Sequence, residues 1–215
     1  MASSDPLVQI TRSGTVLLGP PQDVENLRSE FDRRHSIRLP QLLDAHLLQL
    51  IQDHLDPAQF YERAHGTVGT EFCLTHNKTA GLLHFLTNSP ELFRFIEAAT
   101  GCDRIGCFAG RVYRMMPGAG HYDSWHSDTS DYRMVGMSLN LSTEVFSGGV
   151  FQLRNKESEQ ILCEMPNTGP GDAILFRIAH GLQHQITPIA GAVPKTAFAG
   201  WFKSRPDYPF LPRAR

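Results

Sequence analysis

After Gly101 the chain consists of short runs in which apolar and polar residues alternate, and each run ends at Gly, Pro, Asn or Asp. An alternation of period two is typical of β-strands. Runs at this regular spacing favour an all-β sandwich or barrel. Because the turns are short and no helical crossover intervenes, we expect antiparallel pairing, which suits a jelly roll of two antiparallel sheets. The runs cover residues 105–116, 134–142, 150–154, 159–165, 173–178, 184–189 and 196–203.

The first hundred residues carry helical signals instead. Residues 22–34 predict a short charged helix, and Asp44 precedes leucines that recur at helical spacing, as an N-cap does. Ser89 and Gly101 mark the two ends of a third helix, which has a proline in its first turn. A hairpin is expected at the start of the chain, from residues 8–11 and 15–18.

We therefore predict a mainly β protein with N-terminal helices, in three parts. Residues 1–100 form an N-terminal extension and helical scaffold packed on the barrel, residues 101–205 form the catalytic β core, and residues 206–215 form a C-terminal tail. No internal repeat or low-complexity segment divides the chain further.

Composition narrows the class of protein. The 215 residues are 41% hydrophobic and 20% charged, which is ordinary for a globular chain. The formal net charge of −2 predicts neither nucleic acid nor a membrane surface as partner. No apolar stretch approaches the ~20 residues of a membrane helix, and no secretory signal opens the chain, so we expect a cytoplasmic protein. The cysteines lack the paired spacing of a zinc site and are expected to be reduced: Cys73, Cys102, Cys107 and Cys163.

One histidine–carboxylate pair points to metal chemistry. His126 and Asp128 stand two residues apart, so on a strand their side chains would lie on the same face. A second histidine must come from elsewhere, and His180 and His184 both precede or begin a later run. Two histidines and one carboxylate on one side of a metal leave adjacent positions open, which is the arrangement of non-haem Fe(II) oxygenases.

His184 is the better candidate for the second histidine. It begins the run His184-Gln-Ile-Thr-Pro, in which it should open a strand and share a face with Ile186. His180 lies in a loop that contains glycine, where an exposed turn residue is the simpler interpretation.

The order of five motifs resembles the Fe(II)- and 2-oxoglutarate-dependent dioxygenases, specifically the prolyl-hydroxylase-like branch. The resemblance covers about half of the chain, from Arg104 to Lys203. In sequence order the motifs are Arg114-Met-Met-Pro-Gly, His126-Ser-Asp, Gly148-Gly-Val-Phe, Gly171-Asp-Ala-Ile-Leu-Phe and His184-Gln-Ile-Thr-Pro, followed by Lys195 and then Trp201.

The resemblance implies a double-stranded β-helix, the cupin-like form of the jelly roll. It implies that His126, Asp128 and His184 are the catalytic metal ligands of Fe(II). It also implies that 2-oxoglutarate and dioxygen bind the same iron, and that a substrate C–H is hydroxylated with release of succinate and CO2. Lys195 stands where the family has a cation for the distal carboxylate of 2-oxoglutarate; alternatively it is an exposed charge on a strand.

Two positions depart from the family pattern. Met115 replaces a frequent tyrosine, and Tyr113, two residues earlier on the same strand face, is expected to supply the hydroxyl to 2-oxoglutarate instead. Ser138 stands where one branch has another tyrosine. The polar surroundings of 2-oxoglutarate therefore differ from those of its relatives, although the three metal ligands are present.

The substrate is left open by the residues. A small molecule, a peptide or a protein, with a prolyl residue as one candidate, would all fit the resemblance, and no signal for an oligomeric state is present. Aromatic side chains near the triad either cover the core or, with Arg133 or Arg154, shape a substrate pocket: His121, Tyr122, Trp125 and Tyr132.

Three other functions are alternatives to a hydroxylase. A cupin-like metal-binding module or isomerase would need the same sheets without a distal cation, so Lys195 disfavours it. A catalytically silent relative that binds a partner would have lost a metal ligand, and none is lost. A halogenase of this superfamily lacks the carboxylate, so Asp128 argues for hydroxylation.

Overall fold

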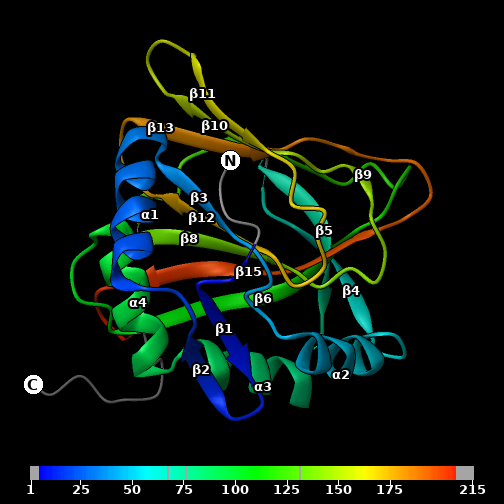
Figure 1. Cartoon of the computed structure of the whole chain (residues 1–215). Coiled ribbons are helices and arrows are strands. Elements are labelled where there is room, and N and C mark those ends of the chain that lie inside the picture. Colours follow the sequence, from blue (N-terminus) through cyan, green and yellow to red (C-terminus); the bar gives the residue numbers. More distant parts are fainter. Residues whose placement is uncertain (1–4, 67, 76, 131, 207–215) are drawn as a thin grey trace, which may run out of the picture.

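The computed structural model describes residues 5–66, 68–75, 77–130 and 132–206. Within them the chain forms four helices and fifteen strands (Figure 1). The helices are α1 (Pro21–Arg34), α2 (Ala45–Leu55), α3 (Lys78–Thr87) and α4 (Pro90–Thr100). The strands are β1 (Val8–Thr11), β2 (Gly14–Leu17), β3 (Ser36–Leu39), β4 (Phe60–Ala64), β5 (Gly69–Leu74), β6 (Cys107–Met115), β7 (Tyr122–His126), β8 (Arg133–Asn140), β9 (Ser147–Gly148), β10 (Phe151–Asn155), β11 (Ile161–Met165), β12 (Ala173–Arg177), β13 (Leu182–Ile186), β14 (Ile189–Ala190) and β15 (Lys195–Lys203).

One large antiparallel sheet nearly closes into a barrel. Its strands follow the order β11-β10-β13-β7-β5-β6-β15-β8-β12-β3, and β4 adds to β5. Figure 1 shows β11, β10 and β13 on one side of the barrel and β6, β15 and β8 on the other. The mainly β architecture, the antiparallel pairing and the jelly roll of the double-stranded β-helix type are thereby confirmed.

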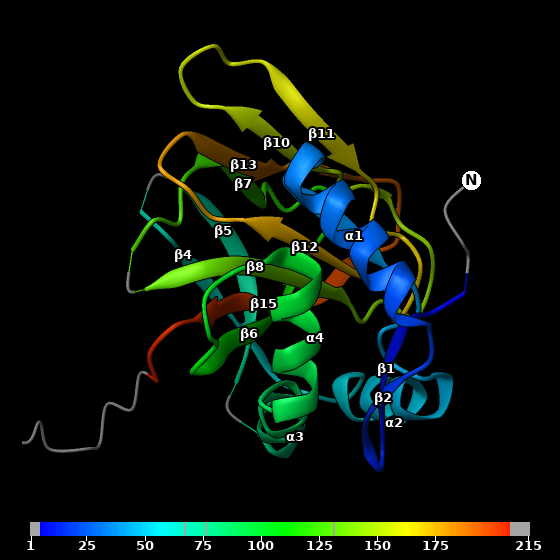
Figure 2. The ribbon, with the colours of Figure 1, turned by 60° about the vertical axis from the view of Figure 1, so that its left-hand side comes forward.

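The two faces of this sheet bury two separate apolar clusters. On β15, Phe198 and Phe202 point outward into the larger cluster, which α4 completes with Leu92 and Phe95. Figure 2 shows α1 and α4 in front of β12, β8 and β15. The smaller cluster fills the interior of the barrel and contains Met115, Phe151, Leu153, Ile174, Phe176 and Ile186. The period-two pattern of the sequence thus separates a helix-covered face from an interior face.

The local signals of the sequence coincide with the observed elements. Each of the seven predicted runs contains or overlaps a strand, and the N-terminal hairpin is β1–β2. Asp44 caps α2, since its carboxylate accepts from the amides of His46 and Leu47. Ser89 caps α4, and Gly101 ends it at φ 60°, in the left-handed region that glycine adopts without strain.

The first hundred residues also supply strands that the sequence did not predict. β3 pairs with β12, and β5 lies between β6 and β7 in the main sheet. β3 has four residues and β4 has no buried position. β5 is longer and mostly buried, but its sequence does not alternate clearly between apolar and polar residues. The helix α3 was not predicted either. The division at residues 100 and 101 stays a prediction, and the predicted tail falls almost wholly on residues 207–215, outside the described residues.

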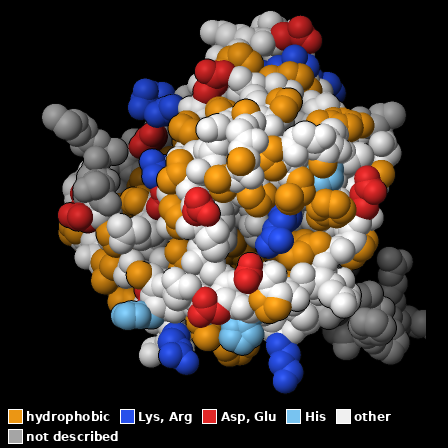
Figure 3. Space-filling view, turned by 90° about the vertical axis from the view of Figure 1, so that its right-hand side faces the viewer, with side chains coloured by type: hydrophobic (Ala, Val, Ile, Leu, Met, Phe, Trp, Pro, Cys, Tyr) orange, Lys and Arg blue, Asp and Glu red, His pale blue; other side chains and the backbone are white. Residues whose placement is uncertain are grey.

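The surface shows charges of both signs. On the side that lies to the right in Figure 1, acidic and basic side chains are scattered singly among hydrophobic ones (Figure 3), in keeping with the near-balanced formal charge. None of the helices in the described part of the chain has the length and apolar character needed to span a membrane. The four cysteines are free thiols, three of them buried.

A tight contact between β15 and β6 gives a stability prediction. Gly200 pairs with Gly110, and a methyl group at Gly200 would meet the backbone of Ala109 and Gly110, which cannot move aside. We expect Gly200→Ala to lower the free energy of unfolding by about 1–3 kcal/mol, the usual cost of overpacking. Gly81→Ala is the control, because this exposed helical glycine has open space and the change should gain up to ~1 kcal/mol. Denaturant unfolding of both variants checks this, and equal stability of Gly200→Ala and the parent chain would contradict it.

Candidate metal and cosubstrate site

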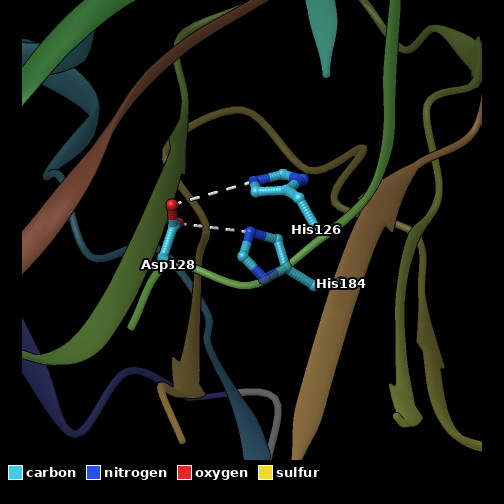
Figure 4. Close-up of side chains that lie close together, drawn as sticks. All are labelled: His126, Asp128 and His184. Carbon is cyan, nitrogen blue, oxygen red and sulfur yellow. Dashed lines mark ion pairs between the residues drawn. The ribbon is translucent and has the colours of Figure 1, made fainter. Parts of the chain in front are cut away.

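The structure brings the three predicted ligands together inside the barrel. His126, Asp128 and His184 each offer one ligand atom, and these atoms lie within 4.8 Å of one another. His184 Nε2 is 3.4 Å from Asp128 Oδ2, and His126 Nε2 is 3.8 Å from Asp128 Oδ1. Figure 4 shows both imidazoles directed at the carboxylate. Two imidazole nitrogens and one carboxylate are a donor set that suits a divalent iron with open positions.

The two histidines are positioned by strand pairing. His126 is the last residue of β7 and lies opposite His184, the middle residue of β13. The sequence predicted that His184 is the first residue of its strand. This prediction is wrong, because β13 already begins at Leu182. The expected companion of His184 is confirmed: Ile186 is buried on the same face. The rival His180 is exposed and lies in the turn before β13, outside the cluster.

The structure places Asp128 in a loop, whereas the sequence predicted that it lies on a strand. The strand β7 ends at His126, so Asp128 lies in the following loop and not on the same strand face. A turn begins there, in which the Ser130 amide donates to the Asp128 carbonyl at 2.7 Å. The carboxylate is instead held by two side chains from other strands. Trp201 Nε1 donates to Asp128 Oδ2 at 2.6 Å, and Arg133 Nη1 donates to Asp128 Oδ1 at 3.1 Å.

The surroundings keep these groups in the form that binds a metal. Burial alone would raise the pKa of Asp128, but the hydrogen bonds and charges of His184, Trp201 and His126 hold this pKa well below its usual range, so the group is a carboxylate. The Ser124 carbonyl lies 2.7 Å from His126 Nδ1 and would accept its proton, which leaves Nε2 with a free lone pair toward Asp128.

Lys195 lies deep in the barrel and is not an exposed strand charge. It begins β15 opposite Met115, has 1% of its surface exposed, and donates from Nζ to the Gly149 carbonyl at 3.1 Å. Burial lowers the pKa of Lys195 to about 8, and the charge of Asp123 opposes this shift. Among the described residues the ammonium has that one hydrogen-bond acceptor for three donors, which suits a carboxylate ligand.

Tyr113 lies on the same face of β6 as Met115 and lines the cavity around the triad. Burial strongly raises the pKa of its phenol, so the hydroxyl stays protonated and can donate. The cavity has a volume of about 80 Å³. Ser138 also lines it, and the Ser138 hydroxyl is buried without a hydrogen-bond partner. The Ser138 hydroxyl is therefore available to a molecule bound in the cavity.

The sequence analysis did not predict the ion pair between Arg111 and Glu71 in the cavity wall. Arg111 Nε lies 2.6 Å from Glu71 Oε1, and His65 Nε2 lies 2.8 Å from the same oxygen. Both Arg111 and Glu71 line the cavity. Arg111 could have been found, because it stands two residues before Tyr113 on a predicted strand. Glu71 gave no signal, since its strand β5 was not predicted.

Several arginines and aromatic residues near the motifs lie outside the cavity lining. Arg114 contacts Phe60 and donates to Thr196, Arg154 contacts Trp125, and neither arginine lines the cavity. The described aromatic residues His121, Tyr122, Trp125 and Tyr132 are absent from its lining. Arg133 is also absent from the lining of this cavity and contacts Asp128 directly, and its role in a substrate pocket stays a prediction.

Comparison with known proteins agrees with the fold and the motifs. Residues 110–203 match the 2OG-Fe(II) oxygenase superfamily. A comparison with curated proteins gives no match.

Several solved structures have the same fold at low sequence identity. An oxidoreductase of the 2OG-Fe(II) oxygenase family from Burkholderia pseudomallei has a TM-score of 0.65 at 14% identity, covering 92% of this chain and 96% of its own. A prolyl hydroxylase from Trichoplax adhaerens, in complex with a hypoxia inducible factor peptide fragment, has 0.63 at 14%, covering 86% and 90%. The non-heme alpha ketoglutarate dependent epimerase SnoN from nogalamycin biosynthesis has 0.64 at 14%, covering 91% and 93%.

The triad should be required for metal binding, whereas His180 should not. We expect His126→Ala, Asp128→Ala and His184→Ala each to weaken Fe(II) binding strongly, because each removes one of three donor atoms, and His180→Ala to leave the Kd nearly unchanged. Anaerobic equilibrium dialysis with Fe(II) measures all four variants. Loss of binding in His180→Ala with retention in His184→Ala would show that the assignment of the second histidine is wrong.

Proposed function

We propose that this protein is an oxygenase of the prolyl-hydroxylase-like kind, which hydroxylates an unactivated C–H of an amino-acid, peptide or protein substrate, with release of succinate and CO2. The match of residues 110–203 to the 2OG-Fe(II) oxygenase superfamily and the fold shared with a prolyl hydroxylase support the proposal. The observation that carries the proposal is the His126–Asp128–His184 cluster inside the barrel. Fe(II), 2-oxoglutarate and dioxygen are the cofactor and cosubstrates of this enzyme class.

The three candidate metal ligands are the residues that would take part most directly in the reaction. His126, Asp128 and His184 would hold Fe(II) through two imidazole nitrogens and a carboxylate oxygen. When bound, the iron with 2-oxoglutarate and dioxygen supplies the oxidation that inserts one oxygen atom into the substrate. Asp128 is already ionised, so no proton has to leave its carboxyl group for a metal to bind. The Ser124 carbonyl next to His126 Nδ1 favours the tautomer that leaves a lone pair on Nε2.

We assign Lys195 to the distal carboxylate of 2-oxoglutarate and Tyr113 to a hydrogen bond with the same molecule. Lys195 supplies a positive charge in an apolar end of the barrel, next to Phe146. A buried carboxylate is costly without such a partner. Ser138, whose hydroxyl lacks a partner, is a second donor for 2-oxoglutarate in the same cavity.

Two structural neighbours catalyse different kinds of reaction. One structural neighbour is a prolyl hydroxylase bound to a peptide, and another is an epimerase. These proteins share the fold at 14% identity, so each makes one outcome worth testing. The carboxylate in the metal cluster argues against a halogenase, and we propose hydroxylation with epimerisation as the alternative outcome of the test. The cytoplasmic location and the lack of a nucleic-acid partner stay predictions from the sequence.

The reaction type is tested with Fe(II), 2-oxoglutarate and a library of amino acids and proline-containing peptides under ¹⁸O₂. We expect a product that has gained one labelled oxygen atom, together with an equal amount of succinate. Asp128→Ala should give neither, and His180→Ala should give both. Inversion without a gain in mass would identify an epimerase, and a chlorinated product in chloride buffer would identify a halogenase; either result would contradict the proposal.

Lys195 should determine the affinity for 2-oxoglutarate and have little effect on the affinity for iron. Lys195→Ala leaves a buried carboxylate unpaired, which costs about 3–5 kcal/mol and corresponds to a Kd raised roughly a hundredfold or more. Lys195→Arg should be partly tolerated, because the charge remains. Calorimetry with Mn(II) in place of iron measures both affinities. Unchanged binding in Lys195→Ala would transfer the role to Arg111, a cation that lines the cavity.

The same interaction predicts a pH dependence. The ammonium form of Lys195 binds the carboxylate, and its pKa of about 8 in the free protein lies below its usual value. The Kd for 2-oxoglutarate should therefore be flat below pH 8 and rise as the pH increases through this value, while Lys195→Arg should stay flat to about pH 9.5 because a guanidinium remains protonated there. A flat profile for the unsubstituted protein would contradict the assignment.

A further inference from the structure

We infer that Arg133 and Trp201 are positioning residues that hold the Asp128 carboxylate in its metal-binding orientation. The inference rests on the proposed function, because it treats Asp128 as a metal ligand. It assigns to these two residues a role that the sequence motifs do not contain.

Asp128 needs such support because of its place in the chain. The two histidines lie on paired strands, whereas Asp128 lies in a loop two residues beyond the end of β7. A loop side chain is free to rotate unless other groups hold it. The hydrogen bonds of Asp128 come from β8 and β15, two strands that pair with each other along most of their length. The orientation of the loop carboxylate is therefore set by the rigid sheet.

Arg133 and Trp201 each donate to a different oxygen of the carboxylate. Trp201 Nε1 donates to Oδ2 at 2.6 Å and Arg133 Nη1 donates to Oδ1 at 3.1 Å. Oδ2 faces His184 Nε2 and Oδ1 faces His126 Nε2. With a donor on each oxygen, the carboxylate is disfavoured from using both oxygens on one metal ion. A ligand that uses one oxygen leaves more positions for 2-oxoglutarate and dioxygen.

Arg133 and Trp201 also hold each other. The guanidinium carbon of Arg133 lies 3.7 Å from the centre of the Trp201 ring, a close cation–π contact. Trp201 lies opposite Gly136 of β8, and Phe176 occupies the space next to this glycine. The side chains of Arg133 and Asp128 are 17% and 12% exposed, so water competes little for these hydrogen bonds. The three side chains thus form one partly buried unit.

The protein contains a matched pair that serves as control. Arg154 stacks on Trp125 with 4.3 Å between the guanidinium carbon and the ring centre, and it does not contact Asp128. These two tryptophans are the only ones in the sequence. Replacing Arg154 or Trp125 therefore removes the same chemical groups from a similar contact without removing a hydrogen bond to Asp128.

The experiment compares Co(II) binding in four variants. Arg133→Met and Trp201→Phe keep most of the side-chain volume and remove the donor to Asp128, while Arg154→Met and Trp125→Phe are the controls. We expect the Co(II) Kd to rise about 10–100-fold in the first two, as for other residues that orient a metal ligand, and to change less than twofold in the controls. The visible d–d absorption bands of bound Co(II) should also move in the first pair alone, and Arg133→Lys should restore part of the affinity.

A second measurement, of Trp201 fluorescence, distinguishes a local effect at Asp128 from misfolding of a variant. Zn(II) should shift the fluorescence of Trp201 in Trp125→Phe, because its indole N–H is bonded to Asp128, and should shift it less once Arg133 is also replaced by Met. Unchanged Co(II) affinity and bands in both Arg133→Met and Trp201→Phe would overturn the inference alone. Failure of the unsubstituted protein to bind Co(II) and Fe(II) would overturn it together with the proposed function.

Discussion

Strand β15 pairs with β6 at nine positions, from Lys195 to Lys203, and with β8 on its other edge. Because side chains alternate along a strand, this pairing turns Lys195, Ala197, Ala199 and Trp201 to the interior and Phe198 and Phe202 to the helix-covered face. The spacing of the whole site follows from it: a cation at one end of the strand, small residues in the middle that leave room, and a donor to Asp128 at the other end. A shift of one residue would exchange the two faces and remove the charge, the space and the donor together.

The charges inside the barrel are arranged so that almost every one has a partner. Asp128 is paired with Arg133, and Glu71 with Arg111. Lys195 differs, because its one hydrogen-bond partner in the described part of the chain is the carbonyl of Gly149, and its pKa is lowered by burial. A buried ammonium without a carboxylate in hydrogen-bond contact is unfavourable for the folded protein alone. We interpret this as an affinity for a carboxylate ligand that is built into the fold.

The sequence predicts the parts of this structure that depend on local chemistry. Alternation identified most of the strands after Gly101, although β7 and β9 lie outside the predicted runs, and the caps Asp44 and Ser89 gave two helix starts. The metal ligands could be selected from motif order, although the argument that placed Asp128 on a strand was wrong. Glu71 and the contacts of Arg133 and Trp201 could not be predicted, because they join segments far apart in the chain through the sheet order. The insertion of β5 between β6 and β7 is one such event that no local pattern indicates.

The most direct test of the account is whether iron and 2-oxoglutarate bind at one place in the barrel. An anaerobic titration of the Fe(II)-loaded protein with 2-oxoglutarate measures this, because chelation of Fe(II) by the keto acid produces a weak visible charge-transfer band. The account predicts that the band appears only when both are present, saturates at one 2-oxoglutarate for each chain, and is absent when succinate replaces 2-oxoglutarate. Tight binding of both molecules without this band would contradict it, since they would then occupy separate sites.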